Sequence, residues 1–123
     1  MRIRRYNEAQ EGLLVKFKEL IDTTDWADEF KKLDYTEAKN DPKMTMSLYE
    51  LAAHAGRTDV IGLLESEIRL NDDEYKELIY DLTQQYRFGK YPNLQKQDYE
   101  KRFEVIKYLV MRCRGWARFR EDI

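Results

Sequence analysis

The segment SLYELAAHAGRTDVIGLL, residues 47–64, decides the fold class because its apolar residues recur at intervals of three and four. That spacing is the period of an α-helix. Gly56 interrupts the pattern where a helix commonly ends on a left-handed residue. The small side chains of Ala52 and Ala53 let another helix approach closely, and a glycine permits the chain to reverse direction. The segment therefore predicts an antiparallel helical hairpin.

The same periodicity extends over most of the chain, which has only two prolines and five glycines to interrupt it. We predict an all-α fold, a compact single domain (residues 1–123) of five or six helices with antiparallel helical hairpins. Besides the hairpin, we expect helices at about 8–21 and 72–86 and a loop at 37–44. A short helix should end near Leu33, with an apolar stripe made of Trp26, Ala27, Phe30 and Leu33. A last helix should carry the apolar stripe Phe103, Ile106, Leu109, Val110 and Cys113.

Helix ends are indicated by residues with cap-forming side chains. Three pairs have the spacing of a capping box, in which each residue bonds the backbone of the other. The expected boxes are Asn7 with Gln10, Ser47 with Glu50, and Asn71 with Glu74; Thr58 and Asp98 are single caps, and Gly115 is a stop.

Charge and cysteine content limit the function classes. The chain has 22 basic and 24 acidic residues, a net charge of −2, which argues against a protein that binds polyanions through its overall charge. The single cysteine cannot form an internal disulfide, so a reducing cytoplasm is the expected location. No signal peptide is expected, and no window approaches the roughly 20 apolar residues of a membrane span.

The segment Ser47–Leu64 resembles a single ankyrin repeat. The resemblance lies in residues 51–53 of the first helix, Gly56, and residues 60–64 of the second helix. The stretch FEVIKYLV, residues 103–110, is similar to the second helix of another such repeat, with the helix from Tyr75 to Tyr86 as its first. The TPLH opening of the family is here SLYE, and its glycine-rich turn is replaced by ESEIRLNDD, so no binding residue is carried over. An unrelated hairpin with convergent packing explains the same residues.

Two side chains qualify as candidates for chemistry. His54 follows Glu50 by four residues, which puts both on one helical face, but two groups make no metal site. Cys113 continues an apolar stripe, which is typical of a buried, inert thiol. No glycine-rich phosphate loop is present. We therefore expect no enzyme activity, no catalytic residue, no metal, no cofactor and no small-molecule substrate, and we expect His54 to be exposed.

The C-terminal segment is basic and aromatic. Residues 101–120 contain seven basic side chains and one acidic, whereas residues 65–81 contain seven acidic and two basic. The arginines of the segment are able to pair with acidic residues of the same fold, bind an acidic protein, or contact phosphates while the aromatic rings stack on bases. The candidate partner-binding residues are Arg112, Arg114, Trp116, Arg118, Phe119 and Arg120.

Elimination of catalytic chemistry leaves binding as the expected function. The leading hypothesis is a non-catalytic protein-protein interaction module, a small accessory or inhibitor protein of phage or mobile-element type that covers a surface of a larger cytoplasmic protein. The alternative is a nucleic-acid-binding regulator that uses the basic aromatic C-terminus.

Overall fold

A computed structural model of the chain describes residues 6–87 and 96–113. The described residues contain helices and no strand, which confirms the all-α prediction. In chain order the elements are α1 (Glu8–Thr23), the 3₁₀-helix η1 (Ala27–Lys32), α2 (Thr36–Lys39), α3 (Pro42–His54), α4 (Thr58–Glu67), α5 (Asp72–Arg87) and α6 (Lys96–Arg112).

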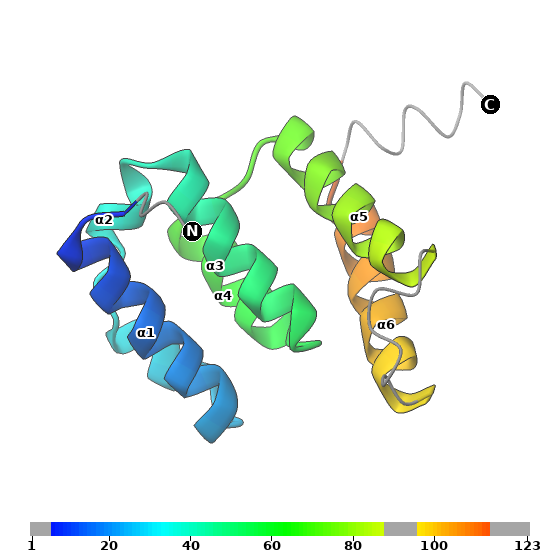
Figure 1. Cartoon of the computed structure of the whole chain (residues 1–123), viewed down its shortest axis with the longest axis horizontal. Coiled ribbons are helices and arrows are strands. Elements are labelled where there is room, and N and C mark those ends of the chain that lie inside the picture. The colour runs from blue at the N-terminus through cyan, green and yellow to red at the C-terminus, as the bar shows by residue number, and fades with distance from the viewer. Residues whose placement is uncertain (1–5, 88–95, 114–123) are drawn as a thin grey trace, which may run out of the picture.

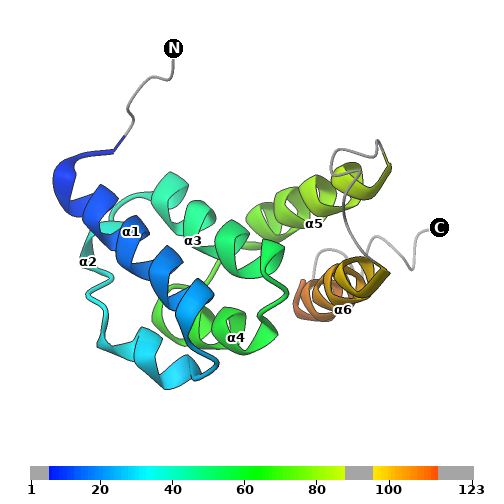
Figure 2. The same ribbon diagram turned by 60° about the horizontal axis from the view of Figure 1, so that its bottom comes forward.

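The helices form two layers. One layer consists of α1, α3 and α5, which lie side by side in that order (Figure 1). In the second layer, η1 packs against α1 and α4, α4 packs against α3, and α6 packs against α5 (Figure 2). Apart from the short helix α2, the described residues thus form three successive helix pairs. The predicted hairpin is α3–α4, and the predicted second pair is α5–α6. Stacked pairs of this kind bury a continuous core that no single pair could enclose.

Helix α3 lies at the centre and contacts α1, α2, α4, α5 and α6. Its apolar face, including Leu48, Ala52 and Ala53, is fully buried. Aromatic rings fill the spaces on either side of it. The Phe17 and Phe30 rings meet edge to face at 5.1 Å between centroids, and those of Tyr49 and Tyr75 meet in the same way at 6.5 Å. The core therefore joins all three helix pairs.

The reversal between α3 and α4 depends on Gly56, which has a φ of +72°. The amides of Gly56 and Arg57 donate to the carbonyls of Ala53 and Ala52, which closes the end of α3. A Cβ atom at Gly56 would lie 3.0 Å from the Cβ of Lys101 on α6. Gly56 is therefore required both for the left-handed turn and for the close approach of the third pair.

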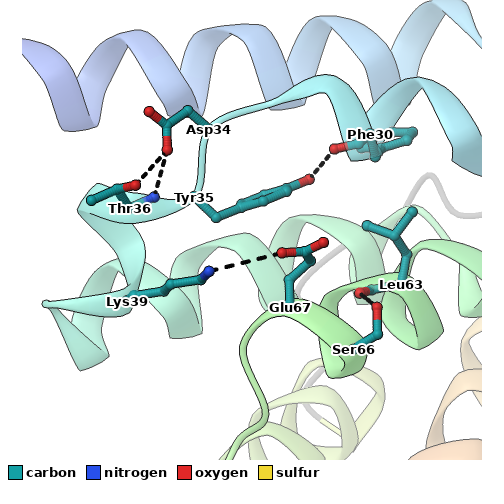
Figure 3. A network of polar contacts seen from close by, with 8 residues as sticks. All are labelled: Phe30, Asp34, Tyr35, Thr36, Lys39, Leu63, Ser66 and Glu67. Carbon is teal, nitrogen blue, oxygen red and sulfur yellow. Dashed lines mark hydrogen bonds and ion pairs between the residues drawn. The ribbon is translucent and has the colours of Figure 1, made fainter.

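Polar contacts join η1 to the start of α2 and join α2 to α4 (Figure 3). The buried Tyr35 hydroxyl donates to the Phe30 carbonyl at 2.6 Å, and burial raises the pKa of this phenol. Lys39 Nζ lies 3.9 Å from the Glu67 carboxylate across the α2–α4 boundary. The first bond thus ties η1 to the N-cap of α2, and the second ties α2 to the central hairpin.

The start of α3 differs from the prediction. Residues 37–44 were predicted as a loop, but they contain most of α2 and the first turn of α3. Asp41 is the N-cap of α3, its carboxylate accepts from the Lys43 amide, and Pro42 occupies the first helical turn. Proline is favoured there because that turn does not use its N–H. Ser47 is therefore inside the helix, and its hydroxyl donates to the Lys43 carbonyl instead of capping.

The other predicted caps have mixed outcomes. The boxes Asn7–Gln10 and Asn71–Glu74 are both confirmed by reciprocal side-chain bonds. Thr58 is the first residue of α4, whose N-cap residue is Arg57, and Asp98 lies inside α6. Both predictions were wrong. Helix α4 begins without a side-chain cap, and α6 begins two residues before Asp98, because helix ends are not fixed by one residue type alone. Gly115 lies outside the described residues.

Two predicted core residues are exposed. Trp26 is 74% exposed and Phe103 is 58% exposed. The region after α1 forms a 3₁₀-helix, so the predicted α-helical stripe does not hold there, and Trp26 precedes that helix as its N-cap residue. On α6, Val105 and Leu109 face the core, which rotates Phe103 toward solvent.

Candidate partner-binding surfaces

Arg112 is the one predicted partner-binding residue that lies among the described residues. Its Nε lies 3.7 Å from the Glu65 carboxylate, its Nη2 donates to the Tyr108 hydroxyl at 3.1 Å, and its guanidinium carbon lies 4.6 Å from the centre of the Tyr108 ring. Arg112 is thus engaged within its own fold. The other five, Arg114, Trp116, Arg118, Phe119 and Arg120, lie outside the described residues.

Glu65 is the centre of a network that joins α4, α5 and α6. Its side chain is only 9% exposed, and its carboxylate accepts hydrogen bonds from the hydroxyls of Tyr75 and, at 2.9 Å, Tyr108. Burial is the main cause of the raised pKa of both phenols, and the Glu65 carboxylate adds to it. Gly62 makes room for this network, because the Tyr108 hydroxyl lies 3.2 Å from where a Cβ atom would stand. The network holds the third helix pair onto the second.

A second group of carboxylates faces across the α3–α5 boundary. The pKa of Glu50 is raised, mainly by burial and then by the negative charges of Asp81 and Glu77 on α5. The raised pKa means that the fold disfavours the ionised form of Glu50. This cost is absent below the unfolded-state pKa and appears as the pH rises through the folded-state pKa.

Glu50→Gln is accordingly expected to stabilise the protein at pH 7, by at most about 1 kcal/mol because Glu50 is partly exposed and solvent screens the repulsion. At pH 3, where Glu50 is protonated in both states, the gain should vanish. Thermal melts of wild type, Glu50→Gln and the exposed control Glu100→Gln at both pH values measure this. A lower melting temperature for Glu50→Gln at pH 7 would contradict the assignment.

The candidates for chemistry are not brought together as a reactive site. Cys113 is 1% exposed, and its thiol lies 3.6 Å from the Asp72 carbonyl oxygen, which confirms that it belongs to the core. His54 ends α3 and is partly buried, so the prediction of an exposed imidazole was wrong. Within residues 6–87 and 96–113, no three His, Cys, Asp or Glu side chains are grouped in a way that could hold a metal ion.

Several large apolar side chains are exposed on this scaffold. On α6, Phe103, Lys107 and Met111 follow one another at intervals of four residues, and Lys107 Nζ lies 5.4 Å from the centre of the Phe103 ring. On α1 and α5 the exposed residues are Val15 and Tyr80. Trp26 stands apart from these, at the connection between α1 and η1.

Sequence reasoning missed Trp26 because it placed the residue on a buried stripe. The neighbouring residues gave no warning, because Asp25 and Asp28 stand at positions that an α-helix would turn onto other faces than that of Trp26.

Comparison of the chain with protein-family models, with curated proteins and with solved structures finds no match. None of the helices that the structure describes combines the length and apolar character needed to cross a lipid bilayer.

Proposed function

We propose that this protein is a non-catalytic protein-binding module. The observation that carries the proposal is the display of large apolar side chains, Trp26 at 74% and Met111 at 87% exposure, on a scaffold whose core is otherwise well packed. Exposed aromatic and methionine side chains are enriched at protein interfaces. Stacked helix pairs also provide an extended, rigid surface, which lowers the entropy cost of binding.

In this proposal the chain is a small accessory or inhibitor protein, of the kind that phages and mobile elements use, and it covers a surface of a larger cytoplasmic protein. The alternative, a nucleic-acid regulator using the basic C-terminus, has less support. Arg112 is already engaged by Glu65 and Tyr108, which leaves it poorly placed to contact a phosphate. Charged residues elsewhere on the described surface are of mixed sign.

A titration with labelled DNA and RNA oligonucleotides separates the proposal from its alternative. The proposal predicts no tight binding at 150 mM salt. A nucleic-acid binder should instead lose affinity by orders of magnitude between about 50 and 200 mM salt, since phosphate contacts release counterions. Tight binding with a steep salt slope would contradict the proposal.

A further inference from the structure

Trp26 is a candidate anchor for a binding partner. Tryptophan is highly buried on average and is the residue most enriched in interface hot spots, so one that is 74% exposed on a folded surface requires an explanation. Its side chain contributes little to the core. Folding alone therefore does not account for a tryptophan at this position.

The chain on both sides of Trp26 is fixed. The Trp26 amide donates to the Thr24 hydroxyl at 3.1 Å, and the Thr24 carbonyl accepts from the Arg57 guanidinium at 2.8 Å. Arg57 is itself held by Asp59, with two bonds of 3.0 Å, and lies over the ring of Phe30. Phe30, four residues after Trp26, is fully buried. The tryptophan is thus presented by a fastened connection, which limits the entropy lost when a partner binds.

The exposed carboxylates next to Trp26 in the chain are not neutralised, since the nearby guanidinium of Arg57 is paired with Asp59. Asp22, in the last turn of α1, and Asp25 are exposed, and neither forms an ion pair among the residues that the structure describes. The last turn of α1 contains no basic residue, although a helix C-terminus favours cations and disfavours carboxylates. The Asp28 carboxylate, by contrast, forms an ion pair with Lys31, whose Nζ lies 3.3 Å from Asp28 Oδ1. Local stability therefore does not explain the acidic residues around the tryptophan.

We infer that Trp26, with Asp22 and Asp25, binds an arginine side chain presented by a partner protein. A guanidinium is planar, so it can stack on the exposed indole while its N–H groups pair with the neighbouring carboxylates. The carboxylates repel a nucleic-acid backbone from this surface. The inference rests on the proposed function and names the surface and the partner chemistry. The α6 stripe of Phe103, Lys107 and Met111 has charges of both signs nearby and selects no such partner.

A displayed library of random peptides, selected against the whole protein at 150 mM salt, tests the inference. Enriched peptides should contain arginine, and their affinity should fall about thirtyfold in Trp26→Ala, as expected for a hot spot. Asp25→Lys should also weaken binding, and replacing the peptide arginine with lysine should weaken it more than a change of sequence elsewhere. Tyr80→Ala, which removes another exposed aromatic ring, should leave affinity unchanged.

The charge around the indole is measured separately by fluorescence quenching in a Trp116→Phe background, where Trp26 is the only tryptophan. Caesium should quench Trp26 more strongly than iodide does, and Asp22→Lys with Asp25→Lys should reverse the order. Equal quenching by both ions, no enriched peptide, or peptides insensitive to Trp26→Ala would overturn the inference. If a protein partner is nevertheless captured through another surface, the proposed function stands and only the Trp26 assignment fails.

Discussion

Glu65→Ala is expected to lower the free energy of unfolding by about 2 to 4 kcal/mol, because it removes the acceptor of two tyrosine hydroxyls. The Tyr75 side chain is fully buried, so its hydroxyl cannot regain a partner from bulk water without opening the α4–α5–α6 junction. Hydrogen bonds to a charged acceptor are also stronger than neutral ones. Urea denaturation followed by circular dichroism gives the value.

Arg112→Ala is the matched control for Glu65→Ala. Its side chain is 49% exposed, and the ion pair with Glu65 is long at 3.7 Å, so Arg112→Ala should lower the free energy of unfolding much less than Glu65→Ala does. Glu65→Gln keeps an oxygen acceptor, so its free energy of unfolding should lie between those of Glu65→Ala and Arg112→Ala. A Glu65→Ala protein as stable as wild type would contradict the conclusion that this network helps to hold the third helix pair onto the second.

Gly56→Val is expected to destabilise the protein by about 2 kcal/mol or more, since a β-branched residue is strained at positive φ and its side chain would press on Lys101. Ala53→Leu should cost about 1 to 3 kcal/mol, because Ala53 is fully buried between helices. Both variants should melt at lower temperature than wild type, by about 3 to 5 °C for each kcal/mol.

Gly12→Ala provides the opposite result in the same assay. Gly12 lies inside α1, and nothing lies within 4 Å of where its Cβ would stand, so alanine should stabilise the helix by about 0.5 to 1 kcal/mol. If Gly56→Val and Ala53→Leu both melt like wild type while Gly12→Ala gains stability, the close-packed α3–α4 hairpin is wrong.

The parts of the fold that sequence reasoning predicted well depend on local interactions. The left-handed turn at Gly56 and the boxes at Asn7 and Asn71 each involve residues only a few positions apart, so their spacing in the sequence is sufficient evidence. The buried position of Cys113 followed from the apolar period of α6. These local features form as predicted because no tertiary contact favours a different conformation at those residues.

The start of α3 could not be predicted because two local signals compete there. Asp41 and Pro42 are equally compatible with a loop and with the first turn of a helix. Tertiary contacts favour the helix: Thr45 donates to the Ala38 carbonyl at 2.7 Å, and the Tyr6 hydroxyl bonds Ser47 at 2.8 Å. These partners are separated by seven and 41 residues, and no periodicity reveals contacts of that kind.

The candidate surfaces were predicted less well than the fold. Arg112 was selected for its basic surroundings, yet Glu65, 47 positions away in the sequence, engages it. The segregation of charge along the chain was compatible both with ion pairs inside the fold and with binding to a partner. For Arg112, the structure decides between these two possibilities because it places Glu65 of α4 beside α6. Trp26 was missed because a 3₁₀-helix changes which side chains share a face.

Binding of this chain to a protein can be measured by capture under conditions that remove nucleic acid. The tagged 123-residue chain is mixed with nuclease-treated cell lysate at 150 mM salt, and the retained material is analysed by size-exclusion chromatography with light scattering and by mass spectrometry. One protein should be retained in a fixed stoichiometry. Retention of nucleic acid when nuclease is omitted, with no protein retained when it is present, would contradict the proposed protein binding.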